Sequence, residues 1–140
     1  MFSGCHSLRS FEQIKEQTIE FFNENQTDFI TAKDTILTTK STDGVFVDDI
    51  DYIRFSVVET SDIITFDYGA QGMLGGQYWG IIFSSDDIPR FDTSISTLTE
   101  SETEGFYFWK EPDGNNICAL ERIAENWFFY YLDYDGHLDV

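Results

Sequence analysis

Residues 126–136 read NWFFYYLDYDG, and this stretch decides the fold class. An unbroken aromatic run at 127–131 is followed by acids at Asp133, Asp135 and Asp139. Neighbouring side chains of a β-strand point to opposite faces, so the run places large rings on both faces of one strand. A half-buried strand would alternate apolar and polar residues instead. The pattern predicts a central strand whose second face is covered by the chain itself or by a partner.

The strands nearest in sequence should form a meander with this one. FYFWK (106–110) and ICALERI (117–123) are strand candidates, separated by the turn cluster EPDGNN (111–116). The segment ERIAEN (121–126) has a helical alternative. Residues 84–105 are polar and contain a proline, which predicts a long loop with at most one short strand.

Further towards the N-terminus, apolar residues recur at every second position, which is the period of β-strands. Strands are expected at 52–59, 62–68 and 77–84, with the glycine-rich stretch GAQGMLGGQ as a turn between the last two. Residues 25–43 are ambiguous, and ILTTK (36–40) is a candidate for a short strand.

The first element is expected to be an amphipathic helix over residues 10–24. Ser10 followed by Gln13 is typical of a capping box at a helix N-terminus. The residues at helical spacing that should face the core are Phe11, Ile14, Phe21 and Phe22. The other side carries glutamates four residues apart, which repel weakly and suit a solvated face: Glu12, Glu16, Glu20 and Glu24.

One helix followed by a run of strands predicts an α+β fold. We expect an N-terminal amphipathic helix packed on a mostly antiparallel sheet of six or seven strands. A chain of 140 residues with 41% hydrophobic residues has the size and core of a single domain, over residues 1–140.

The charge balance constrains the partners. The chain has 26 acidic against 8 basic residues and a formal net charge of −18. This field repels phosphate backbones and anionic membrane surfaces, so neither nucleic acid nor membrane is an expected partner. Solubility is the commoner reason for such an excess, but self-repulsion also destabilises the fold, which suggests a basic protein partner.

No combination of residues indicates an enzyme, a cofactor or a required metal. Cys5, Cys118 and the terminal histidines form neither a disulfide framework nor a convincing nucleophile and base. DYDGHLD (133–139) begins like a calcium loop, but its glycine is at the fourth position and the closing glutamate is missing. The start lacks the features of a signal peptide and no apolar run is long enough to span a membrane, so a cytoplasmic protein is expected.

Acids repeatedly flank aromatic residues, as in DDIDYIRF, FYFWKEPD and FYYLDYD. Aromatic residues anchor protein interfaces, and surrounding carboxylates steer a basic partner towards them. Core aromatics in a generally acidic protein explain the same pattern. The candidate partner-binding residues are Asp48, Asp49, Asp51, Asp86, Asp87, Glu111, Asp113, Asp133 and Asp135.

Two stretches, GGQYWGIIFSSDDIPRF (75–91) and GFYFWKEPDGNNICALERIAENWFFYYLDYDG (105–136), resemble small immunity proteins of bacterial polymorphic-toxin and contact-dependent growth inhibition systems. The likeness lies in a G-G-x-Y-W-G strand, an S-x-D-D-x-P turn and an E-R-I-x-x-N-W-x-x-Y ending, and it covers a little over a third of the chain. It implies a non-enzymatic inhibitor that neutralises one cognate toxin, expected to be a basic nuclease. It implies no particular interface residues.

A second function class stays open from the residues alone. Exposed rings can serve as stacking platforms in a small-molecule or carbohydrate-binding module, and Trp79, Trp109 and Trp127 are the candidates for that role.

Overall fold

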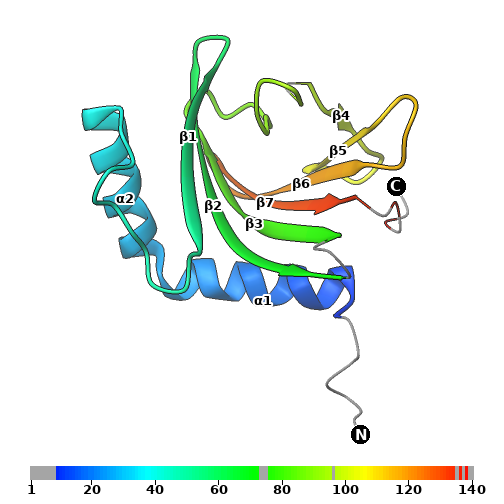
Figure 1. The fold of residues 1–140 in the computed structure, drawn as a ribbon, viewed down its shortest axis with the longest axis horizontal. Coiled ribbons are helices and arrows are strands. Elements are labelled where there is room, and N and C mark those ends of the chain that lie inside the picture. The colour runs from blue at the N-terminus through cyan, green and yellow to red at the C-terminus, as the bar shows by residue number, and fades with distance from the viewer. Residues whose placement is uncertain (1–8, 73–75, 96, 135, 137, 139–140) are drawn as a thin grey trace, which may run out of the picture.

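The computed structural model describes residues 9–72, 76–95, 97–134, 136 and 138. Within these residues it confirms the α+β fold, with two N-terminal helices and one antiparallel sheet in the strand order β1-β2-β3-β7-β6-β5-β4 (Figure 1). The elements are α1 (Phe11–Glu24), α2 (Gln26–Thr39), β1 (Tyr52–Val58), β2 (Ser61–Gln71), β3 (Gln77–Ser84), β4 (Thr99–Glu100), β5 (Phe106–Lys110), β6 (Ile117–Ala124) and β7 (Trp127–Asp133).

Helix α1 begins where the sequence predicts it. The Ser10 hydroxyl accepts a hydrogen bond from the backbone N–H of Gln13 at 3.1 Å, and the Gln13 side chain accepts one from the Ser10 N–H at 2.9 Å. This reciprocal pair satisfies two N–H groups that a helix N-terminus leaves open, so the capping box is confirmed.

The core-facing side of α1 is confirmed in part. Ile14 and Phe22 are buried, whereas Phe11 and Phe21 are half-buried at the margins of the helix–sheet contact. The ring of Phe21 stacks on Tyr68 of β2, with the ring centroids 4.4 Å apart. Phe21 therefore shields the edge of the core, and Phe22 is the residue inside it.

Most of residues 25–43, which the sequence left ambiguous, form helix α2. ILTTK forms the end of this helix and not a strand. The threonines there suggest a strand, but the hydroxyls of Thr35, Thr38 and Thr39 donate to backbone carbonyls four residues earlier, which accommodates them in a helix. The residues that α2 buries have helical spacing: Phe29, Ala32 and Ile36.

The hairpin of β6 and β7 is regular except for one register shift near its turn. Strand β6 continues to Ala124, with a register shift between Arg122 and Ala124, and this excludes the helical alternative for ERIAEN. Asn126, with a φ of 72°, completes the turn into β7. Asparagine tolerates this left-handed conformation better than most residues.

Strand β7 is buried on both of its faces, and the chain itself covers both. Trp127, Phe129 and Tyr131 pack towards the helices. The alternate residues on the other face pack with Phe91, Ile95 and Leu98 of the long loop before β4, and they are Phe128, Tyr130 and Leu132.

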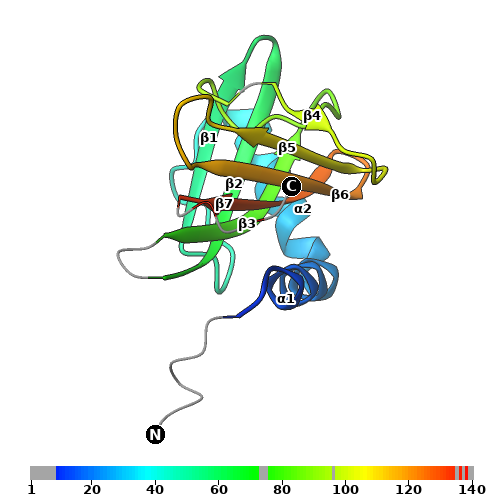
Figure 2. The same cartoon turned by 90° about the vertical axis from the view of Figure 1, so that its right-hand side faces the viewer.

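The sheet curls so strongly that it has a convex and a concave face. Figure 1 shows α2 beside β1 and α1 crossing below the strands, both on the convex side. Figure 2 shows β5 and β6 curling over the other side, where the loop between β3 and β4 also lies. No helix of the described chain is long and apolar enough to cross a membrane.

Truncating Phe22 should be one of the most destabilising changes in α1. Its side chain is 2% exposed, so Phe22→Ala should lower the free energy of unfolding by about 3–5 kcal/mol. Phe21→Ala should cost less because that ring is only half-buried. Urea unfolding measures both changes. Phe46→Ala is the matched control, because Phe46 is 78% exposed and its loss should change stability by no more than about 0.5 kcal/mol. Equal losses for Phe22→Ala and the control would contradict this packing.

Candidate functional site

The structure separates the predicted acids into different parts of the molecule. Asp48, Asp49 and Asp51 lie in the loop between α2 and β1. The other described candidates are found in the loop after β3, in the turn between β5 and β6 and at the end of β7, and they are Asp86, Asp87, Glu111, Asp113 and Asp133. Asp135 is outside the described residues.

Asp86 and Asp87 hold their own loop in place. Asp86 accepts hydrogen bonds from Arg90 Nη2, the Ile88 N–H and the Ser84 hydroxyl, each at 3.0 Å. Burial opposes ionisation of Asp86, but these hydrogen bonds outweigh it and lower the pKa of the carboxyl. Asp87 accepts from Arg122 Nη1 and from the backbone N–H of Asn126.

Asp133 is 1% exposed at the end of β7, where its carboxylate accepts the Leu138 N–H at 2.7 Å and the Gln77 amide at 3.3 Å. This carboxylate therefore ties Leu138 to the end of β7. Asp113 is exposed in a turn that is closed by a hydrogen bond from the Glu111 N–H to the Asn116 carbonyl at 2.8 Å.

Asp48, Asp49 and Asp51 are different, because all three are exposed. None makes an ion pair or a side-chain hydrogen bond within the part of the chain that the structure describes. Lys40, at the start of the loop, is paired with Asp62 at 2.9 Å instead. Their negative charge is therefore available to another molecule.

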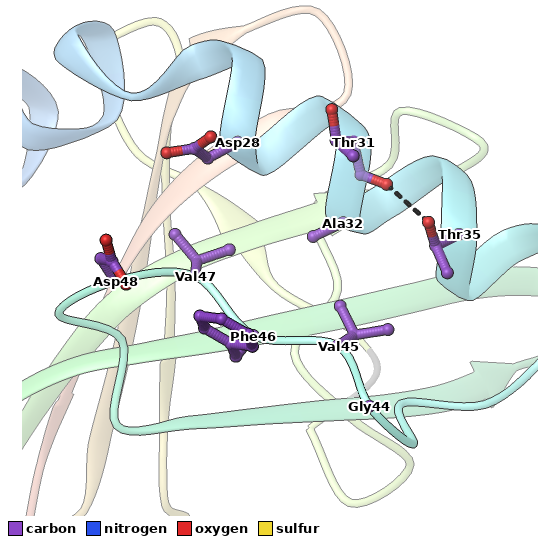
Figure 3. Close-up of a pocket in the computed structure, with 9 residues that line it drawn as sticks. All are labelled: Asp28, Thr31, Ala32, Thr35, Gly44, Val45, Phe46, Val47 and Asp48. Carbon is purple, nitrogen blue, oxygen red and sulfur yellow. Dashed lines mark hydrogen bonds between the residues drawn. The ribbon is translucent and has the colours of Figure 1, made fainter.

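The same loop presents Phe46, whose 78% exposure is the highest among the large hydrophobic residues that the structure describes as exposed. Its neighbours Val45 and Val47 pack on the core, and Figure 3 shows both directed towards α2. The loop is anchored further by hydrogen bonds from the Ile50 N–H to the Val47 carbonyl, at 3.0 Å, and from the Asp51 N–H into β2, at 2.8 Å. Phe46 is thus exposed on a fixed backbone.

A groove of about 360 Å³ runs between α2 and this loop. We call it the acidic groove, and its lining residues are Asp28, Thr31, Ala32, Thr35 and residues 44–48. Figure 3 shows Asp28 on the helix and Asp48 on the loop at the same end of the groove. A smaller hollow of about 200 Å³, which Asp51 and Tyr52 help to line, also has Phe46 in its wall.

The acidic surface continues from the loop to the end of α1. The pKa of the Tyr68 hydroxyl is raised, first by burial and then by the nearby carboxylate of Asp49. Glu24 and Glu20 raise this pKa further, whereas Arg9 lowers it. The last turn of α1 holds no basic residue. Acids near a helix C-terminus interact unfavourably with the helix dipole, so this surface is retained at a local cost in stability.

The sequence missed Phe46 and Asp28 as site residues. The signal for Phe46 is the triplet VFV at 45–47, where two valines pack inward and the residue between them must then face outward. Asp28 had no such signal, because its role depends on α2 lying against the loop. The tryptophans proposed as stacking platforms are not exposed: Trp79 and Trp127 are buried and Trp109 is half-buried.

The chemistry of the described residues adds no reactive centre. Cys118 is a free, buried thiol in the concave core, and burial raises its pKa, which disfavours the reactive thiolate. Within the described ranges, no group of three or more His, Cys, Asp or Glu residues is placed to hold a metal. Cys5 and three of the seven residues of the calcium-like stretch, Asp135, His137 and Asp139, lie outside those ranges.

Asp86→Asn should destabilise the protein in a pH-dependent way. The folded-state pKa of Asp86 lies below its ordinary value, so its ionised form stabilises the fold at neutral pH, and this contribution is lost as the pH falls through the folded-state pKa. The substitution should cost about 1–3 kcal/mol at neutral pH. The difference from the unmodified protein should shrink towards about pH 2 in urea unfolding. Asp113→Asn, on an exposed turn, is the control, and a pH-independent difference for Asp86→Asn would contradict the assignment.

Comparison of the chain with protein-family models, with curated proteins and with solved structures found no match. The function must therefore be argued from the residues and geometry of this chain.

Proposed function

We propose that this protein is an acidic immunity protein that binds one basic protein toxin, expected to be a nuclease, and neutralises it through the acidic groove and Phe46. The observation that carries the proposal is Phe46, 78% exposed on an anchored loop, among carboxylates that make no ion pair within the described part of the chain. Such a ring leaves apolar surface in water unless a partner covers it.

Phe46 has the properties of an interface anchor. Burying a phenylalanine side chain contributes about 1.5–3 kcal/mol. The loop backbone is fixed before binding by Val45, Val47 and its hydrogen bonds, so little conformational entropy is lost when a partner arrives. A central aromatic anchor surrounded by polar groups is the usual arrangement of a binding hot spot.

The carboxylates supply the complementary charge. A lysine or arginine of the toxin that enters the acidic groove would meet Asp28 and Asp48 together, and its stem would lie along the ring of Phe46. Asp49 and Asp51 extend the negative field outward. This field attracts a basic partner over several ångströms and raises the association rate.

The resemblance to immunity proteins lies in four of the seven strands and outside the acidic groove. Residues 75–91 and 105–136 form β3 and β5 to β7, whereas the acidic groove is built from residues 28–48. The stretches that carry the resemblance thus contribute strands of the scaffold and no residue that lines the acidic groove. That division suits an inhibitor that must match its own toxin.

If this proposal holds, a basic toxin domain should be encoded beside this protein's gene, and that domain would be the partner used in the test. Co-expression should keep cells alive, and Phe46→Ala should weaken binding by about 2 kcal/mol, mainly through faster dissociation. Asp48→Asn should mainly slow association, and raising the salt concentration should reduce that difference. Surface plasmon resonance measures both rates.

Ile88→Ala and Asp113→Asn are matched controls, because they alter an exposed apolar residue and an exposed acid outside the acidic groove. Both should bind the toxin as the unmodified protein does. Cells that die as fast with this protein as without it would contradict the immunity function. Normal rescue by Phe46→Ala, with unchanged binding, would instead contradict the choice of surface.

A further inference from the structure

A second cavity lies on the concave face of the sheet, and the acidic groove does not include it. It has a volume of about 340 Å³, within the range of small-molecule sites. We call it the tyrosine pocket, and its lining residues are Tyr52, Arg54, Asp67, Tyr78, Tyr130, Leu132 and Tyr134.

A hydrogen-bonded network fixes the charged side of this pocket. Asp67 accepts a hydrogen bond from Arg54 Nη2 at 2.9 Å and another from the Tyr130 hydroxyl. Burial of Tyr130, and then the nearby Asp67 carboxylate, raise the pKa of that hydroxyl well above its ordinary value, so it stays protonated and donates. The network exists before any ligand arrives.

Gly80 makes this network possible. Asp67, Gly80 and Tyr130 are directly paired neighbours on β2, β3 and β7. A Cβ atom on Gly80 would lie 2.0 Å from the Phe66 carbonyl oxygen and 2.7 Å from Cε2 of Tyr130, so a side chain there would displace both the β2 backbone and the ring. The missing side chain allows Tyr130 to reach across β3 to Asp67.

The rest of the pocket is aromatic and open to solvent. Tyr52, Tyr78 and Tyr134 are 62%, 37% and 47% exposed, although most aromatic residues of this protein lie in its cores. Tyr78 and Tyr134 contact each other edge to face, with their ring centroids 5.7 Å apart. Tyrosine rings offer apolar faces together with hydroxyls that donate and accept hydrogen bonds.

The charges select against an ionic ligand. The guanidinium of Arg54 would repel a cation, and the carboxylate of Asp67 would repel an anion. The net charge of −18 disfavours anions further. The pocket therefore suits a neutral molecule that has an apolar face and hydroxyls that both donate and accept.

We propose that the tyrosine pocket binds a neutral saccharide unit. One C–H face of the pyranose ring lies on the exposed tyrosine rings. The sugar hydroxyls donate to Asp67 and accept from Arg54 and the tyrosine hydroxyls. This site is independent of toxin binding through Phe46, except that Tyr52 lines both the tyrosine pocket and the smaller hollow beside Phe46.

The test is binding of simple sugars to the full chain. Saturation-transfer NMR and calorimetry would use the methyl glycosides of glucose, galactose, mannose and N-acetylglucosamine, together with glucuronate and glucosamine as charged counterparts. At least one neutral glycoside should bind, and tighter than the charged sugars. Tyr78→Ala and Tyr134→Ala should each weaken that binding roughly tenfold, and both residues are exposed enough for the fold to tolerate the change.

Ile88→Ala is the control, because it removes an exposed apolar side chain outside the pocket and should leave sugar binding unchanged. Three outcomes would overturn the proposal: no neutral glycoside binds, a charged sugar binds more tightly than its neutral counterpart, or the tyrosine variants bind as the control does. None of these outcomes affects the proposal for Phe46, which is tested with the toxin.

Discussion

Strand β7 is buried on both of its faces, and the helices and the long loop before β4 lie where they cover it. A strand in the middle of the sheet with large rings on both faces exposes apolar surface unless both faces are covered, and apolar burial is the main favourable term in folding. The helices cover the face of Trp127 and Phe129. The curl of the sheet and the long loop that carries Phe91 cover the face of Phe128 and Tyr130. The polar character of that loop conceals its role, because only a few of its residues reach the core.

Because both faces of β7 are covered, the most exposed aromatic side chains lie elsewhere in the molecule. The most exposed aromatic residues, Phe46 and Tyr52, lie in or beside the loop that leads into the edge strand β1. Phe46 lies on a backbone that is fixed by Val45 and Val47 and by hydrogen bonds, so its position combines exposure with rigidity. Tyr52 joins the two proposed sites, because it lines the tyrosine pocket and the smaller hollow beside Phe46.

The sequence predicted the fold well where the period of apolar residues was clear. Strand β3 has the predicted bounds, and the capping box of Ser10 places the start of α1 correctly. Helix α2 was missed because its threonines favour strands in isolation, while the packing of Phe29 and Ile36 on the sheet determines the helix. The candidate site was harder to predict, because composition does not reveal which acids form an ion pair with an arginine. Asp86 pairs with Arg90, whereas Asp48 makes no ion pair within the described residues.

The distribution of ion pairs explains why the free acids matter. Basic residues are few, and the described ion pairs use most of them inside the molecule: Lys15, Lys33, Lys40, Arg54, Arg90 and Arg122. Such pairs stabilise loops and strand edges, but within the described residues none of them includes Asp48, Asp49 or Asp51. The repulsion within this surface is relieved when ions or a basic partner bind to it. A partner that brings its own lysines or arginines gains attraction without breaking any internal pair, which favours protein binding at the acidic groove over the ion-paired loop of Asp86.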